Sequence, residues 1–109
     1  RVLPPCVNRS GVEFTVEPLD DGASAVRWGL AAVKNAGAAA VTAIVAAREA
    51  RPTGEFRGLD EFCAEVDWQV VNRRVAESLA KCGALDCFGA RGSVLAGLET
   101  AIAAGQKRQ

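Results

Sequence analysis

Hydrophobic residues recur every three or four positions over much of the chain, which is the spacing of a helix. Between residues 29 and 48 this pattern is interrupted once, by the small residues Asn35, Ala36 and Gly37. The spacing predicts a short helix over 30–35 and a longer helix over about 38–50, because small residues and glycine suit a tight backbone turn. The segment therefore indicates two helices joined by a hairpin.

Three further helices are expected after this hairpin. Apolar stripes indicate helices over about 59–66, 70–81 and 91–104, and Asn72 is placed to cap the second of them. Arg48 and Arg51 lie near the end of the helix that precedes these three. There, positive charge complements the helix dipole.

A second break in the helical pattern resembles the first. It consists of Cys82, Gly83 and Ala84, and it follows Lys81 just as the first break follows Lys34. We therefore expect two helix-hairpin-helix units packed about a pseudo-twofold axis. Both hairpins would then lie on one face of the molecule.

The N-terminal part alternates with period two instead. Residues 13–17 and 25–28 show this alternation, and the turn signal Asp20-Asp21-Gly22 lies between them. Such a pattern is typical of a hairpin of two short strands. We therefore predict a mainly α fold, in which an extended or short-strand segment (1–28) precedes a tandem helix-hairpin-helix bundle (29–104) and a polar tail (105–109).

Composition and charge refine this picture. The chain has 109 residues, which suits one domain, and hydrophobic residues make up 50% of it but aromatic residues only 6%. This favours helices packed closely over small side chains. Lysine plus arginine and aspartate plus glutamate number 13 each, so the formal net charge is zero. Autonomous nucleic-acid-binding domains are usually basic, so this balance indicates a weak contact, one of several made by a larger protein.

The chain begins at Arg1 without a methionine and ends in a polar stretch, so we expect it to be a piece of a longer protein. The opening residues lack the charged and apolar regions of a signal peptide. Lys34, Asn35 and Gly37 interrupt the alanine-rich run that would be the only candidate for a membrane span. We therefore expect no membrane partner and a cytoplasmic location.

No metal site, cofactor site or active site is expected within the chain. The four cysteines (Cys6, Cys63, Cys82 and Cys87) contain no C-x-x-C pair and the chain has no histidine, so they are interpreted as reduced thiols. The serines have no nearby base, and the acidic residues occupy a turn and the start of a helix. Nucleophilic and general acid–base catalysis both need a closer constellation.

The first hairpin does offer an anion site. The helix after it begins with free backbone N–H groups beside Ala38, Ala39 and Ala40, whose small side chains leave room for a phosphate. Taken alone, a glycine between two helices is most often a plain αα-hairpin, in which Gly37 serves packing and Lys34 serves the helix dipole. The combination of lysine, small residues and open N–H groups favours phosphate binding that is independent of base sequence and sensitive to salt. The candidate DNA-binding residues are Lys34, Asn35, Ala36, Gly37, Ala38, Ala39 and Ala40, then Lys81, Cys82, Gly83 and Ala84, with Arg48 and Arg51 as further candidates.

Four blocks of the chain carry a resemblance to a known family. They read LPPCVNRSG (3–11), VRWGLAAVKNAG (26–37), FRGLDEFCAEVD (56–67) and VNRRVAESLAKCGALDCFG (71–89). In this order they resemble the region after the fingers of the bacterial replicative DNA polymerase III alpha subunits, the C-family polymerases. Two positions differ from that family's usual pattern. Cys6 stands where aspartate is usual, and Asn35 replaces a glycine common in helix-hairpin-helix motifs, although asparagine tolerates the same left-handed backbone.

The resemblance implies a tandem helix-hairpin-helix domain that contacts duplex DNA during DNA replication. The implied partners are duplex DNA, the other domains of the polymerase, and the sliding clamp through sequence beyond this chain. DNA-directed DNA polymerase activity, a nucleotidyl transfer, would belong to other parts of the parent protein. The alternative is a structural or protein-interaction module that braces the polymerase and its clamp-binding region. The position of the basic residues discriminates between the two, since convergence on the hairpin face favours DNA binding.

Overall fold

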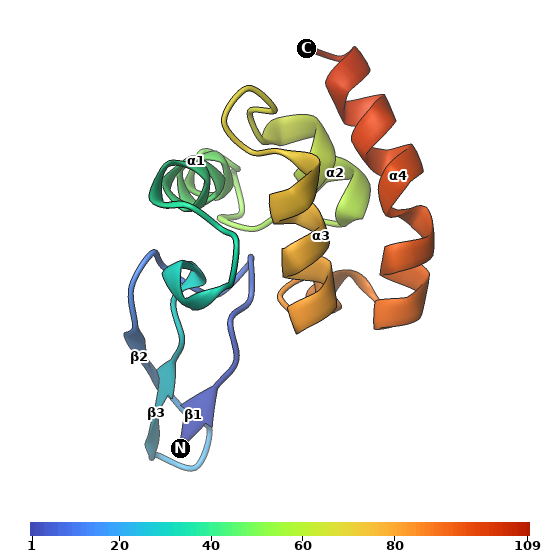
Figure 1. Cartoon of the computed structure of the whole chain (residues 1–109). Coiled ribbons are helices and arrows are strands. Elements are labelled where there is room, and N and C mark those ends of the chain that lie inside the picture. The colour runs from blue at the N-terminus through green and yellow to red at the C-terminus, as the bar shows by residue number, and fades with distance from the viewer.

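The alternating residues near the N-terminus form a small sheet that projects from a body of helices. The computed structural model describes residues 1–109, and Figure 1 shows the sheet at one end and the C-terminus at the other. The elements are β1 (Val2–Leu3), β2 (Thr15–Pro18), β3 (Ser24–Arg27), a 3-10 turn η1 (Leu30–Ala32), α1 (Ala38–Glu49), α2 (Leu59–Glu65), α3 (Arg73–Cys82), a second 3-10 turn η2 (Asp86–Phe88) and α4 (Arg91–Lys107).

The predicted strand hairpin is confirmed. β2 and β3 pair antiparallel with Val16 opposite Val26, and the turn between them contains Gly22 at a φ of 86°. β1 adds a third strand, parallel to β3, with Val2 also opposite Val26. The strand order is therefore β1-β3-β2. Alternation could not predict β1, because a strand of two residues is too short to show a period.

The three later helices are confirmed, with shifted ends. α3 begins at Arg73 because the Asn72 side chain accepts a hydrogen bond of 2.9 Å from the Val75 N–H, which is the predicted cap. α4 continues three residues past the predicted end at 104, to Lys107. Gly105 lies inside this extension and is buried against α2, so helix packing rather than local pattern sets the end of α4.

The predicted helix over 30–35 is wrong. Only one 3-10 turn forms there, Leu30–Ala32. The N–H groups of Leu30 and Ala31 donate instead to the carbonyls of Gly11 and Val12, each at 3.0 Å. These two N–H groups belong to the first turn and would lack an acceptor within a helix of any length. The helix ends after one turn because Val33 is extended, with ψ at 127°, and Asn35 has a positive φ.

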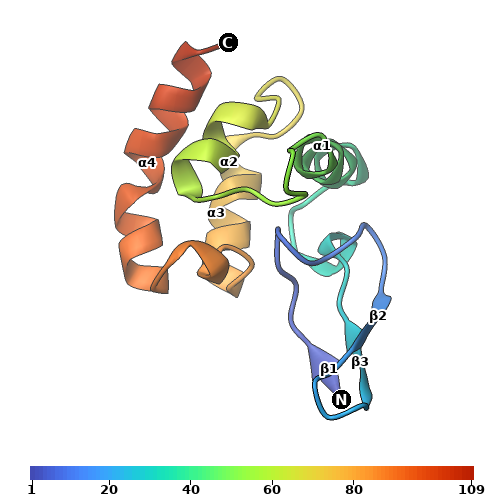
Figure 2. The ribbon, with the colours of Figure 1, turned by 180° about the vertical axis from the view of Figure 1, so that it is seen from behind.

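One hydrophobic core joins all the helices. The views from front and back show α2 and α3 between α1 on one side and α4 on the other (Figures 1 and 2). Phe62 of α2 packs at its centre, with ring centroids 5.2 Å from Phe56 and 5.9 Å from Phe88. No helix combines the length and the hydropathy that a membrane span requires.

Candidate nucleic-acid interface

The first turn is shaped by Asn35 rather than by Gly37. Asn35 is the only residue other than glycine with a positive φ, at 70°, and so adopts the left-handed backbone that asparagine tolerates. Gly37 has ordinary extended angles, φ −70° and ψ 161°. A Cβ atom on Gly37 would meet no atom within 4 Å. The sequence-based interpretation of Gly37 as the residue that lets the chain turn is therefore wrong.

The N-terminus of α1 carries free hydrogen-bond donors. Its first helical bond runs from the Val41 N–H to the Gly37 carbonyl at 3.0 Å, and no side chain caps this end. The N–H groups of Ala38, Ala39 and Ala40 consequently have no acceptor within the chain. Ala38 and Ala39 are exposed. An anion approaching α1 therefore finds several N–H donors and no bulky side chain.

Two lysines flank an open hollow beside this turn. The hollow has a volume of about 280 Å³ and lies between the first turn and the C-terminal half of α3. Lys34 and Lys81 are both exposed, and neither has a carboxylate within 4.0 Å. The lining residues are Val33, Lys34, Asn35, Ser78, Lys81 and Cys82. The tertiary fold thus brings together two unpaired positive charges that are far apart in the sequence.

Asn35 connects the two sides of this hollow. Its Nδ2 atom lies 3.4 Å from Ser78 Oγ on α3, and its Oδ1 atom lies 3.4 Å from an Nη atom of Arg74. These are long, exposed hydrogen bonds, so their contribution to stability is small. They do add a third cation, Arg74, to the neighbourhood of Lys34 and Lys81.

The second turn does not present N–H donors as the first one does. Gly83 ends α3 in the left-handed conformation at a φ of 94°. Its N–H donates to the Ala80 carbonyl at 3.3 Å, and the Ala84 N–H donates to the Leu79 carbonyl at 2.9 Å. This is a Schellman closure of α3, which occupies both donors. The backbone of Gly83 and Ala84 is therefore not open to a phosphate.

The counterpart of the α1 N-terminus is instead the start of α4, eight residues after Gly83 at Arg91. No side chain caps that end either. The nearby Asp86 carboxylate accepts a hydrogen bond of 2.9 Å from Arg91, and this bond lowers the pKa of Asp86. The acid and the base neutralise each other, so the second turn is less attractive to anions than the first.

Arg48 and Arg51 lie away from the hollow and serve the fold. Arg48 is only 6% exposed, and its guanidinium donates to the Val7 and Ser10 carbonyls at 3.0 and 2.6 Å. Arg51 pairs with Glu61 and Glu65 at 3.3 and 3.0 Å. Neither guanidinium is free to contact DNA. A sequence signal existed for Arg48, because it continues the buried stripe of Val41 and Ile44 at helical spacing.

The cysteines are free thiols in different surroundings. Burial raises the pKa of the Cys63 thiol to about 12, which suits a core residue. A hydrogen bond from Cys87 lowers the pKa of Cys6 to about 6. Cys82 lines the hollow and is exposed. The structure holds no group of three or more side chains of the metal-binding types.

Comparisons with known proteins agree with the fold and with the resemblance. A family model described as helix-hairpin-helix motif matches residues 1–94. The chain is 48% identical over 98 residues to the DNA polymerase III subunit alpha of Thermus aquaticus, covering 90% of this chain and 8% of that protein. It is 41% identical over 101 residues to the subunit of Deinococcus radiodurans, covering 93% of this chain and 7% of that protein. It is also 41% identical over 103 residues to the subunit of Bacillus subtilis, covering 94% of this chain and 8% of that protein. The resemblance inferred from the four sequence blocks is confirmed, and the chain spans less than a tenth of the length of these relatives.

Proposed function

Since the chain belongs to the helix-hairpin-helix motif family, we propose that it binds duplex DNA without reading the base sequence, as one module of a replicative DNA polymerase III alpha subunit. The observation that carries this proposal is the convergence of Lys34 and Lys81 on the hollow beside the open end of α1. Convergence of these two lysines is the arrangement that favours DNA binding over a purely structural role.

The proposed contact is with the phosphate backbone. A phosphate oxygen would accept hydrogen bonds from the N–H groups at residues 38–40, where the helix dipole also favours negative charge. Lys34 and Lys81 would add point charges from either side of the hollow. Such contacts position a protein on the duplex and carry no information on sequence. They suit a polymerase module, which has to bind every sequence that is copied.

A net charge of zero makes this module a weak binder by itself. In the polymerase it would act with the other domains, and with the sliding clamp bound through sequence outside this chain. Nucleotidyl transfer would be carried out elsewhere in that protein. The module's contribution would be to hold duplex DNA and so to keep the polymerase on its template.

The second candidate function is a bracing module that contacts only protein. The ion pairing favours it, because six arginines (Arg27, Arg48, Arg51, Arg57, Arg73 and Arg91) already have carboxylate partners. A module of this kind would not bind DNA at any salt concentration. Fluorescence anisotropy with a duplex of arbitrary sequence therefore separates the two functions.

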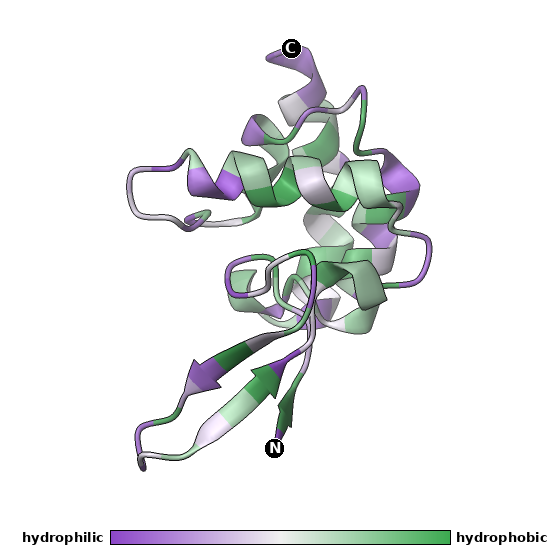
Figure 3. Ribbon diagram, turned by 90° about the vertical axis from the view of Figure 1, so that its left-hand side faces the viewer, coloured by the Kyte–Doolittle hydropathy of each residue, from purple (hydrophilic) through white to green (hydrophobic).

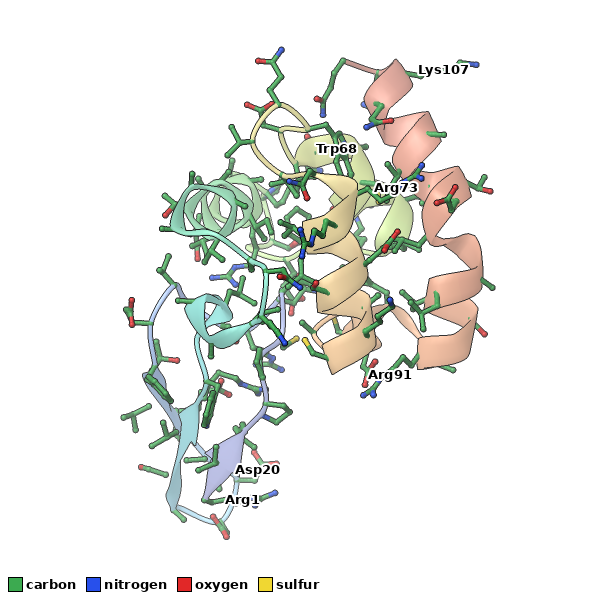
Figure 4. All side chains as sticks on the ribbon, in the orientation of Figure 1. Arg1, Asp20, Trp68, Arg73, Arg91 and Lys107 are labelled. Atoms are coloured by element: carbon green, nitrogen blue, oxygen red, sulfur yellow. The ribbon has the colours of Figure 1, made fainter.

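We expect the chain to bind duplex DNA at low salt, with log K falling linearly as log salt rises. Replacing both Lys34 and Lys81 by glutamine should reduce the magnitude of that salt slope by about 2, one for each lost phosphate contact. Lys107→Gln is the matched control, because Lys107 lies at the far end of α4 from Arg91 and the second turn (Figure 4). An unchanged slope in the folded double variant would exclude these lysines from the contact. No binding even at low salt would favour the bracing module.

Gly37→Val tests the donors at the end of α1. The fold should tolerate the change, because φ at Gly37 is −70° and a Cβ there meets nothing within 4 Å. The branched side chain would crowd a phosphate at the N–H groups, and we expect affinity for duplex DNA to fall about tenfold, or 1.4 kcal/mol. Circular dichroism and urea unfolding control for the fold. A folded variant that binds like the parent chain would contradict this phosphate position.

A further inference from the structure

One face of the N-terminal sheet is apolar and exposed. Five large hydrophobic side chains occupy it, with exposed fractions between 37% for Val26 and 71% for Val16. The sheet stands clear of the helices, and its strands carry hydrophobic segments (Figure 3). These five residues form the apolar sheet face: Val2, Phe14, Val16, Val26 and Trp28.

The strand register places all five on the same side. Val2 and Val16 both pair with Val26, and residues directly opposite each other point to the same face. Phe14 and Trp28 lie two residues from Val16 and Val26, so the period of two puts them on that face as well. Their ring centroids are 5.1 Å apart. The face is therefore one continuous strip across three strands rather than five scattered residues.

On the opposite face of the sheet the charged side chains are paired and the apolar side chain is buried. There Arg27 forms a salt bridge with Glu17 and also donates to the Pro4 carbonyl at 3.0 Å. Ala25, which shares that face, is 2% exposed. One face of the sheet thus has its charges paired and its alanine buried, whereas the other face leaves its apolar side chains exposed to solvent. Continuous exposed apolar surface of this kind marks an interaction site.

The charges beside this face disfavour nucleic acid as its occupant. Glu13, Asp20 and Asp21 lie in or next to the hairpin and have no cationic partner within 4.0 Å, while the positive charge of Arg27 is neutralised by Glu17. The exposed Arg1 precedes Val2 and lies near Asp20 (Figure 4), so these acids outnumber the one unpaired cation next to the strands. Exposed aromatic rings could stack on bases, but single-strand-binding surfaces combine such rings with a positive groove. This face combines them with acids. A protein surface with an apolar centre and basic residues at its rim is complementary to it.

We propose that the apolar sheet face is covered by another part of the same polymerase polypeptide, through an apolar protein surface with a basic rim. This rests on the proposed function, because the relatives are polymerases of which the matched segment is only about 8%. In a polypeptide of that length, residues ahead of Val2 leave directly from β1, which is part of this sheet. The covering surface is thus tethered beside the face, which makes the association intramolecular and raises its effective concentration.

Hydroxyl-radical footprinting without DNA tests this proposal independently of DNA binding. Labelling is compared between this chain alone and the polymerase-length protein that contains it. Phe14 and Trp28 should be labelled readily in the isolated chain and fall to the level of the buried Phe62 in the longer protein. The exposed thiol-bearing Cys82 and the half-buried Trp68 lie outside the face and monitor the remainder of the chain. Equal labelling of Phe14 and Trp28 in the two proteins would overturn the proposal.

Val16→Glu in the longer protein should restore labelling of Phe14 and Trp28, because it places a charge in an apolar contact that is already beside acids. Val70→Glu is the matched control, since Val70 is 40% exposed and lies outside the sheet. Val16→Glu should leave DNA binding by the isolated chain unchanged. The DNA-binding proposal and the docking proposal can therefore fail separately, and the two experiments distinguish them. Protection of Phe14 and Trp28 by added DNA, or by dimer formation of the isolated chain, would also overturn the proposal.

Discussion

Arg48→Met should lower the free energy of unfolding by about 3 kcal/mol, because it leaves buried carbonyl groups without a charged donor. The Arg48 guanidinium bonds to the carbonyls of Val7 and Ser10, and both of these residues are 0% exposed. Methionine has a similar length and fills the space but donates no hydrogen bond. Equilibrium urea unfolding followed by circular dichroism measures the loss.

Arg48→Lys is the matched control for this prediction. Lysine keeps the charge and can reach one carbonyl, but it lacks the planar fork that serves both. Its stability should therefore fall between those of the parent chain and Arg48→Met. If Arg48→Met unfolds like the parent chain, the two hydrogen bonds contribute no net stability.

The second large effect is expected at Gly105, where α4 passes directly over α2. A Cβ atom on Gly105 would collide with the backbone carbonyl of Cys63 and lie 3.2 Å from the Ala64 nitrogen. Backbone atoms cannot move aside as a flexible side chain can, so the two helices would have to separate. Gly105→Ala should therefore cost about 3 kcal/mol of unfolding free energy, at the upper end of the usual range for overpacking.

Gly97→Ala provides the opposite result in the same helix. No atom lies within 4 Å of a Cβ placed on Gly97, and alanine is the better helix former by about 1 kcal/mol. Thermal or urea unfolding should thus show a stabilised Gly97→Ala and a destabilised Gly105→Ala. If both variants are stabilised, α2 and α4 do not approach as closely as the structure has them.

Arg48 also bears on the candidate site. Arg48 binds the N-terminal segment to α1, and the same segment supplies the carbonyls of Gly11 and Val12 that hold η1. The first turn follows η1 directly, so its position depends on this buried guanidinium. Arg48 therefore supports the proposed DNA contact from within the fold rather than by touching DNA.

Local sequence predicted the features that depend on a few neighbouring residues. The period of two located the β2–β3 hairpin, and apolar stripes located α1 to α4. Asparagine chemistry predicted the Asn72 cap and allowed the left-handed backbone of Asn35. Each of these follows from the conformational preferences of a short segment, which the sequence displays directly.

The errors have both local and tertiary causes. The helix predicted over 30–35 ends after one turn because Val33 is extended and Asn35 has a positive φ. Arg48 was expected near DNA, and partners about 40 residues earlier in the chain bury it. The N–H groups of Gly83 and Ala84 close α3. The bonds of Gly83 and Ala84 are local and follow from the left-handed glycine that ends α3. Only Arg48 found its partners through folding, and no local pattern records that choice.

The sequence by itself therefore determined the order and type of the elements, the family resemblance, and the small-residue turn before α1. Only the tertiary structure decided which cations are free. It brought Lys34 and Lys81 to one hollow, buried Arg48 and joined Arg51 to two carboxylates. It also aligned five hydrophobic residues on one side of the sheet. The physical reason is that spacing along a chain reports local conformation, whereas the surroundings of a charge are set by segments that meet only when the chain folds.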